Sequence, residues 1–339
     1  MIKLDDIINI LIAAIPGVAA LIYTHKNQVN LEKLRSFLAD EKAERDALRD
    51  YKYEARKRLY EEIEPLLFQL NEACENALHR IYSIARTARA GDLGEDGWLS
   101  REGYYALSTM YKLILPVTII KLIQRKLTLV DLSVDPGINA QYLLAKGLYL
   151  SFTDDFDFAG LKPSLPYDPN RKDWLEKRPS HPEKYWRQGV PLGRLDNAAD
   201  ALVKDEERGQ WISFGEFQAA YKAKTPEVHE KFDSIASIIL HFHPQTRPVL
   251  WRLLIAQAHI YEALLRSRKM QMSATDQHAE PLLVLIPSES RGKFDWRRSE
   301  EEATDSEVLR TPFEVAEQYL HKCLAEFVRS PTRKLDTGA

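Results

Sequence analysis

Residues 7–23 of the chain read IINILIAAIPGVAALIY, and this stretch contains no charged side chain. As a helix rising about 1.5 Å per residue, the segment would be about 26 Å long, close to the ~30 Å of a membrane's hydrocarbon core. Pro16 and Gly17 would break a short helix in water, but a helix in lipid tolerates such a pair. We therefore predict a transmembrane anchor in residues 1–26, with the apolar side chains Ile7, Ile10, Leu11, Ile12, Ile15, Val18, Leu21 and Ile22.

Two alternatives to a membrane anchor remain open for this stretch. A cleaved signal peptide would use Val18, Ala19 and Ala20 as a processing site, but Asp5 and Asp6 replace the positive leader that such peptides carry. The segment could also be an amphipathic helix that lies on a membrane surface or is buried in the protein. The length and the uncharged composition favour the anchor over both.

The charges on either side of the anchor predict its orientation. Lys3 precedes it together with Asp5 and Asp6, whereas Lys26, Lys33 and Arg35 follow it against a single acid, Glu32. Because positive flanks stay on the cytoplasmic side, the short N-terminus should cross the membrane and the C-terminal body should remain cytoplasmic. The chain has only two cysteines, Cys74 and Cys323, which fits a reducing compartment.

Overall composition describes an ordinary folded chain. Of 339 residues, 45% are hydrophobic and 29% are charged, which excludes wholesale disorder. With 47 basic and 50 acidic side chains the net charge is −3, so the chain does not coat nucleic acid by overall attraction. Two cysteines exclude a disulfide scaffold.

Downstream of the anchor we predict a helical stalk in residues 27–64. This segment is rich in charge and free of glycine and proline, and it is polar on nearly all sides over residues 39–46. Leu31, Leu34 and Leu38 share one face of this helix. A short coiled coil between two copies of the chain therefore stays open as an alternative. The apolar stripe resumes at Leu48 with a mean step of about 3.6 residues, and Pro65 should end or kink a helix near Glu64.

The helical domain is predicted to cover residues 65–330, followed by a flexible tail at 331–339. Residues 101–126 form a very apolar helix after an N-cap at Ser100, but Lys112, Lys121 and Pro116 argue for a buried core helix and against a second membrane span. Further helices are predicted at residues 139–150, 192–207, 227–242, 247–272 and 312–329. Residues 281–287 should be extended, and residues 289–307 should form a mobile, charged surface loop.

The fold class is therefore mostly α: a single N-terminal transmembrane helix, a helical stalk and a multi-helix cytoplasmic bundle with long irregular loops. The loop at residues 160–194 combines prolines, aromatic rings and basic side chains. Cations neutralise phosphates and rings stack on bases, so this loop is a candidate phosphate or partner site. Simple packing of the loop against the body competes with that interpretation. The candidate residues are Arg171, Lys172, Trp174, Arg178, Tyr185, Trp186 and Arg187.

Four aspartates form a second candidate site. Asp154 and Asp155 lie in SFTDDFDF, and Asp196 and Asp200 are one helical turn apart in LDNAAD. Two carboxylates at i and i+4 share a helix face and can hold Mg²⁺, which would suggest metal-assisted hydrolysis of a phosphate compound. The alternative is that these aspartates cap helices or pair with nearby cations, for example Asp200 with Lys204.

The sequence contains no P-loop, GxGxxG, GxSxG or HExxH motif, so we expect no cofactor and favour a role without catalysis. The favoured function is a membrane-tethered interaction or regulatory module, such as a sensor, adaptor or effector. The expected partners are a membrane and a protein, with homo-oligomerisation left open. A nucleic acid or phosphate ligand is not favoured. The alternatives are a metal-dependent hydrolase or binder of a phosphate compound and a membrane-disrupting effector.

Overall fold

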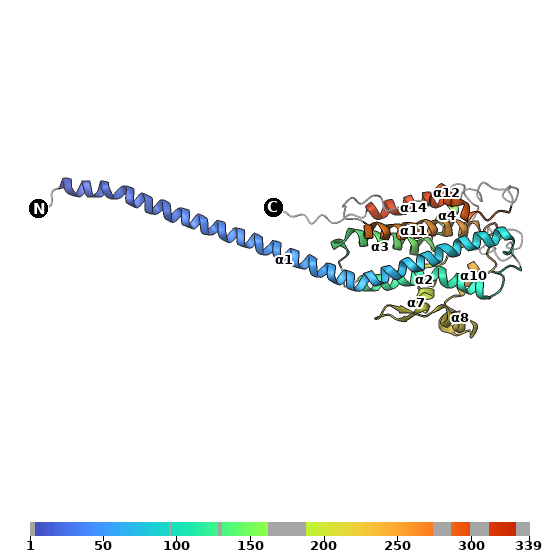
Figure 1. Cartoon of the computed structure of the whole chain (residues 1–339). Helices are drawn as coiled ribbons and strands as arrows, with labels where there is room; N and C mark the ends of the chain where they lie inside the picture. The colour runs from blue at the N-terminus through green and yellow to red at the C-terminus, as the bar shows by residue number, and fades with distance from the viewer. Residues whose placement is uncertain are drawn as a thin grey trace. The chain divides into compact units, whose positions relative to one another are not determined.

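The computed structural model describes residues 4–94, 96–127, 131–161, 188–273, 286–298 and 312–329. Within these ranges the side chains of residues 4–22, 133, 268–273 and 323–329 are left undescribed. The chain divides into two compact units, residues 1–58 and residues 59–339. The described chain is mostly helical, which confirms the mostly α part of the predicted class (Figure 1).

Helix α1 runs without interruption over Leu4–Ala90, so the predicted helix end near Glu64 is wrong, while the alternative of a kink there stays a prediction. Proline removes one N–H from the helical ladder and leaves the carbonyl of Glu61 without its usual partner. Both Pro65 and Glu61 are exposed, so water can satisfy that carbonyl. The opposite face buries Ile63 and Leu66 completely or nearly so, and this packing outweighs the lost hydrogen bond.

The first unit consists of the N-terminal part of α1. The backbone of residues 7–23 is helical, but their side chains up to residue 22 lie outside the described set, so the anchor stays a prediction. Every side chain of residues 23–58 is at least partly exposed. The exposed large apolar side chains of this segment are Tyr23, Leu31, Leu34, Phe37, Leu38, Leu48, Tyr51 and Tyr53.

The second unit is a helical bundle. Helix α11 (Pro248–Ser273) packs against α14 (Pro312–Arg329), α3 (Pro136–Ser151) and the short α4 (Asp155–Gly160), as Figure 1 shows. Helix α2 (Tyr104–Lys126) packs against α7 (Leu192–Leu202) and α3. The smaller elements are α8 (Phe214–Lys222), α9 (Pro226–His229), α10 (Asp233–Ile239), α12 (Ser288–Arg291) and the 3-10 turns η2 (Leu132–Val134) and η3 (Gly292–Phe294).

Helix α2 is the one helix among the described residues that is long and apolar enough to cross a membrane. However, 83% of its most apolar window is buried inside the protein, as predicted for a core helix. The positive charge of Lys121 is compatible with this burial because its ammonium group extends to the surface of α2 and pairs there with the carboxylates of α7. The prediction of a buried core helix over residues 101–126 is therefore confirmed.

Several predicted boundaries were wrong. The N-cap of α2 is Gly103, while the Ser100 hydroxyl donates to the carbonyl of Gly97 in the preceding turn. The helix predicted to run to residue 207 ends at Leu202, because the chain then forms the antiparallel strands β1 (Val203–Asp205) and β2 (Gln210–Trp211). The helix predicted for residues 227–242 is divided into α9 and α10.

The start of α11 is capped by a residue that is distant in sequence. The side-chain oxygen of Gln188 accepts hydrogen bonds from the N–H groups of Val249 and Leu250 at 2.8 and 3.1 Å. These are two of the four N–H groups that the first turn of a helix leaves without a partner. The neighbouring Val190 donates its N–H to the carbonyl of Phe152 at 2.7 Å, which attaches this segment to the end of α3.

Candidate functional site

The predicted basic and aromatic site lies outside the described residues. This applies to all seven of its members: Arg171, Lys172, Trp174, Arg178, Tyr185, Trp186 and Arg187. The segment directly after it, residues 188–190, is buried against α3, α4 and α11. The phosphate-binding role of the loop therefore stays a prediction.

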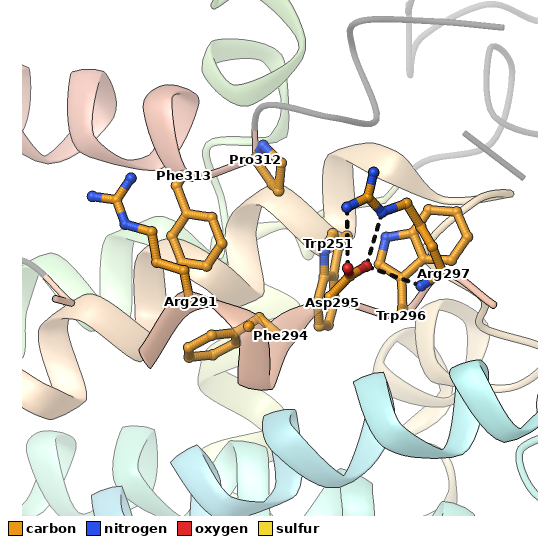
Figure 2. A pocket seen from close by; sticks show the side chains of 9 residues that line it. Trp251, Arg291, Phe294, Asp295, Trp296, Arg297, Pro312 and Phe313 are labelled. Atoms are coloured by element: carbon orange, nitrogen blue, oxygen red, sulfur yellow. Dashed lines mark hydrogen bonds and ion pairs between the residues drawn. The ribbon is translucent and has the colours of Figure 1, made fainter. Parts of the chain in front are cut away.

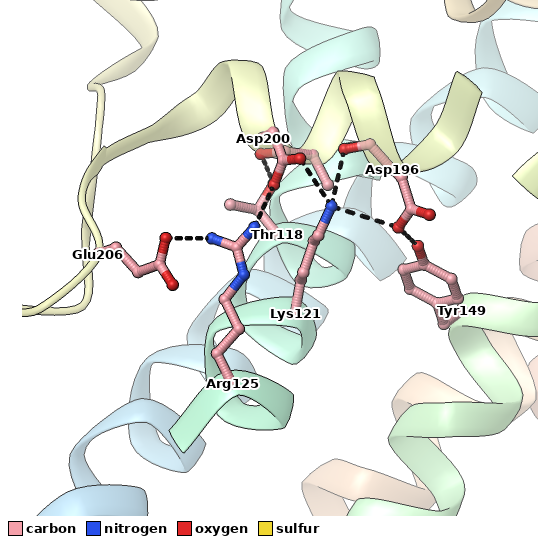
Figure 3. Close-up of polar contacts among 8 residues, drawn as sticks. Thr118, Lys121, Arg125, Tyr149, Asp196, Asp200 and Glu206 are labelled. Carbon is pink, nitrogen blue, oxygen red and sulfur yellow. Dashed lines mark hydrogen bonds and ion pairs between the residues drawn. The ribbon is translucent and has the colours of Figure 1, made fainter. Parts of the chain in front are cut away.

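Asp196 and Asp200 meet two cations from α2 (Figure 3). The Nζ atom of Lys121 lies 3.3 Å from Asp196 and 2.8 Å from Asp200, and only 14% of the Lys121 side chain is exposed. Arg125 adds a second contact to Asp200 at 3.0 Å and bonds Glu206 at 2.6 Å. The cluster joins α2 to α7, so it replaces the predicted pairing of Asp200 with Lys204, which instead bonds Glu216.

A tyrosine from α3 completes this cluster. The Tyr149 hydroxyl donates to the carboxylate of Asp196, and burial together with that carboxylate raises the pKa of the tyrosine. Three helices thus share one group of polar contacts. Because each carboxylate already bonds a donor on a neighbouring element, the arrangement fits interhelical pairing better than metal binding.

Asp154 and Asp155 lie at the start of α4, and each has its own protein partner. Asp154 accepts from the hydroxyl of Tyr319 on α14 at 2.5 Å, and burial raises the pKa of this carboxyl. Asp155 is fully buried and accepts the N–H of Gly189 at 3.2 Å. Within the described residues, no three histidine, cysteine or acidic side chains form a group that could hold a metal ion.

Replacing Lys121 with methionine is expected to lower the free energy of unfolding by about 1–2 kcal/mol. This lies between the cost of losing a surface ion pair and that of breaking a buried one, because the lysine is mostly buried while the carboxylates are partly exposed. Urea titration measures the change. Arg208→Met, which removes an exposed pair with Asp205, should change stability by less than about 0.5 kcal/mol. Equal effects of the two substitutions would contradict the interhelical role.

A second candidate site is an aromatic pocket of about 220 Å³ (Figure 2). It is formed where α12 and η3 meet α11 and the first residues of α14. Its lining residues, which define the aromatic pocket below, are Trp251, Arg291, Gly292, Phe294, Asp295, Trp296, Arg297, Pro312 and Phe313. Four aromatic rings and three charged groups therefore surround one small space.

The described part of the loop predicted for residues 289–307 is not a mobile surface segment. Phe294 and Trp296 are 2% and 3% exposed, and residues 288–294 form α12 and η3. Residues 299–307 lie outside the described set. The sequence signal that was missed is the alternation of large rings with charged residues in KFDWRR: rings of this size are worth burying even in a highly charged segment.

The charged groups of the aromatic pocket are held in place by ion pairs. Arg297 bonds Asp295 through two nitrogens at 2.9 and 3.0 Å, and hydrogen bonds from Arg297 are the main reason that the pKa of Asp295 is lowered. Arg291 bonds Glu317 of α14 at 2.6 Å, and its guanidinium carbon lies 5.1 Å from the centre of the Phe313 ring. Such bidentate and stacked geometries are specific to arginine.

Next to the aromatic pocket, His259 of α11 is completely buried. Its Nδ1 atom accepts the N–H of Ile286 at 2.9 Å, and its ring packs edge-on against Phe313 with centroids 5.9 Å apart. Burial, assisted by the positive charge of Arg291, lowers the pKa of His259 to about 4. The imidazole is therefore neutral at neutral pH.

Stability should fall as the pH is lowered from 6.5 towards 4. In this range the unfolded chain protonates His259, whose ordinary pKa is about 6.5, while the folded chain keeps it neutral. The contribution of His259 to the free energy of unfolding should thus drop by about 2 kcal/mol between pH 7.5 and pH 5. Urea titrations at both pH values test this. His259→Gln, which keeps an acceptor but does not titrate, should lose that part of the pH dependence.

Comparison of the chain with protein-family models, with curated proteins and with solved structures finds no match. The functional conclusion therefore depends on the residues and contacts described above.

Proposed function

We propose that the protein is a membrane-tethered helical module that acts by binding partners at the cytoplasmic face of a membrane. Residues 7–23 would span the bilayer, residues 23–58 of α1 would bind a protein partner, and the second unit would remain on the cytoplasmic side. Tethering confines such a module to a thin layer and raises its effective concentration towards partners in the same layer.

The observation that carries the proposal is the exposed apolar face of α1 before residue 59. Leu31, Leu34 and Leu38 are 53%, 54% and 51% exposed, and they recur at helical spacing. Counted at 100° per residue, these leucines and Leu48 fall within an arc of about 100°. Burying such a face on a partner is favourable by roughly 25 cal/mol per Å² of apolar surface.

The membrane anchor is supported by the free energy of insertion that its composition predicts. Residues 7–23 contain nine isoleucine, leucine and valine residues. Each favours insertion by about 0.3–0.6 kcal/mol, so together they contribute about 3–5 kcal/mol. Residues 23–58 add ten lysines and arginines against seven acids, a net charge of +3 that suits the anionic cytoplasmic leaflet.

Replacing Ala14 with arginine is expected to release the protein from membranes. One arginine at the centre of a span costs about 2.5–3.5 kcal/mol, which cancels most of the favourable insertion free energy. Fractionation after a carbonate wash measures the membrane-bound share. Ala14→Leu is the matched control and should stay in the pellet. A wild-type chain that the wash removes from vesicles would overturn the anchor.

Protection from protease in sealed vesicles tests the orientation, because a cytoplasmic body is digested in inside-out vesicles and protected in right-side-out ones.

Site-specific photo-crosslinking tests the partner face. A crosslinker at position 34 should form an adduct, whereas one at position 36, on the opposite side of the helix by the 100° rule, should form none. Adducts at both positions or at neither would contradict a defined binding face.

A further inference from the structure

The exposed leucines of α1 follow a seven-residue repeat. In the letters of a coiled coil, Leu31 and Leu38 occupy position a, and Leu34 and Leu48 occupy position d of their repeats. These are the two positions at which paired helices meet. All four side chains are more than half exposed, so unit 1 leaves this seam uncovered. The repeat ends near Leu48, because Leu59 is already buried in the second unit.

The residues on either side of the seam complement a second copy of the same chain. In a parallel pair of helices, each g position faces the e position five residues later on the other helix. Glu44 then meets Arg49 of the second copy, and the ring of Phe37 meets Lys42. No facing pair carries two like charges. The e positions are Arg35, Lys42 and Arg49, and the g positions are Asn30, Phe37 and Glu44.

The same charges disfavour the antiparallel arrangement. An antiparallel pair brings e positions against e positions, and all three of them between residues 31 and 49 are basic. Arg49 already contacts Asp46 and Asp50 of its own helix at 3.5 and 3.6 Å, but its side chain is 73% exposed. Exposed contacts of this kind are weak, and a guanidinium group has five N–H donors, so Arg49 can also bond a carboxylate of a second chain.

Two charged residues interrupt the seam and define its register. Glu41 occupies the next d position and Arg45 the next a position, and their side chains bond at 3.3 Å within one helix. In an in-register pair, these opposite charges lie in adjacent layers of both helices. A shift by seven residues would instead place Arg45 against Leu38 and Glu41 against Leu34. Polar residues at such positions fix the register at a cost in stability, so the pair should be specific but weak.

We propose that residues 27–48 of α1 form a parallel, in-register coiled coil with a second copy of this chain. The inference rests on the proposed function, since it names the partner of the face assigned there to α1. Anchors in one membrane would point both helices in the same direction. They would also raise the effective concentration of each copy towards the other, which compensates for the short seam.

Disulfide trapping of the full-length chain in vesicles of phosphatidylcholine and phosphatidylglycerol tests the arrangement. Cys323 is replaced by serine, and Cys74 can stay because it is fully buried. Asn27→Cys places a thiol at a d position without removing a leucine, and Ser36→Cys places one at the outer f position. On mild oxidation we expect a covalent dimer from Asn27→Cys and about tenfold less from Ser36→Cys. An antiparallel pair would not bring position 27 against itself, so it would give no dimer there.

A charge exchange tests the recognition between copies. Energy transfer between donor-labelled and acceptor-labelled chains in the same vesicles measures self-association. Glu44→Arg and Arg49→Glu should each weaken it about tenfold, because both symmetric pairs then carry like charges. The double variant should restore it. Leu38→Lys should abolish the energy transfer, whereas Ser36→Lys, on the outer side of the helix, should leave it unchanged. Thermal melting of the second unit should be the same in all of these variants.

Several outcomes would overturn the coiled coil. They are equal trapping at positions 27 and 36, no trapping at position 27, or a double charge variant as weak as the single ones. If the crosslinker at position 34 captures a different protein while position 27 forms no disulfide, the coiled coil fails and the proposed function stands. If the carbonate wash removes the chain while position 27 still forms the covalent dimer, the anchor fails and the coiled coil stands.

Discussion

Replacing Tyr319 with alanine is expected to lower the free energy of unfolding by about 3–5 kcal/mol, as for other large aromatic side chains removed from a protein core. Tyr319 is completely buried in α14, and its ring lies against Phe158 of α4 with centroids 4.1 Å apart. Its hydroxyl donates to Asp154 at 2.5 Å. The substitution would therefore leave a cavity and remove a donor from a partly buried carboxylate. Urea titration followed by circular dichroism measures the loss.

Tyr319→Phe separates the two contributions. It keeps the ring and removes only the hydroxyl, so we expect a loss of about 1–3 kcal/mol, typical of a hydrogen bond to a charged group. The pKa of Asp154 should rise further in this variant, because the bond from Tyr319 is the main interaction that counteracts burial. If the two substitutions had equal effects, the packing of the ring would contribute nothing, contrary to the geometry.

Replacing Gly189 with alanine should cost about 1–3 kcal/mol, the usual range for overpacking a core. A Cβ atom at this position would lie 2.7 Å from the Cβ and 2.8 Å from the Cγ of Asp155, and 3.0 Å from the carbonyl oxygen of Phe152. Asp155 is fully buried, and the second obstacle is backbone, so neither can move without disturbing α3 or α4. The neighbouring Gln188 cap on α11 should weaken at the same time.

Gly193→Ala is the matched control for this prediction. A Cβ atom on Gly193 has no heavy atom within 4 Å, and the residue lies in the first turn of α7. Alanine should therefore be neutral or stabilise the protein by up to about 1 kcal/mol. Thermal melting of the two variants gives the comparison. A stable Gly189→Ala variant would mean that residues 188–190 do not pack against α4 as described.

The long helices could be predicted from apolar periodicity alone. The predicted helices at residues 247–272 and 312–329 agree with α11 and α14 to within one residue, and α2 is the predicted core helix. Periodicity works for such elements because each buries one or more faces in the core over most of its described side chains. A helix end near Pro65 was wrongly allowed for, because an exposed proline is tolerated there, and the helix end at residue 202 was missed, because a short hairpin follows it.

The candidate sites were less accessible to sequence reasoning. The one-turn spacing of Asp196 and Asp200 correctly places both carboxylates on one face of α7, but nothing in that spacing shows that Lys121 and Arg125 lie opposite them. The aromatic pocket gave no sequence motif, because Trp251, Phe294 and Phe313 come from three separate segments. Chain neighbours reveal local geometry, whereas a pocket depends on contacts between distant elements.

The sequence by itself determined the helical class, the uncharged stretch at residues 7–23 and the apolar positions that each long helix would bury, since these follow from composition and from the period of a single helix. Only the tertiary structure decided that the aspartates of α7 pair with α2, that Gln188 caps α11, and that the rings of three segments line one pocket. The physical reason is that side-chain pairing and cavity shape are set by which helices pack together, and helix packing is decided by the whole core at once.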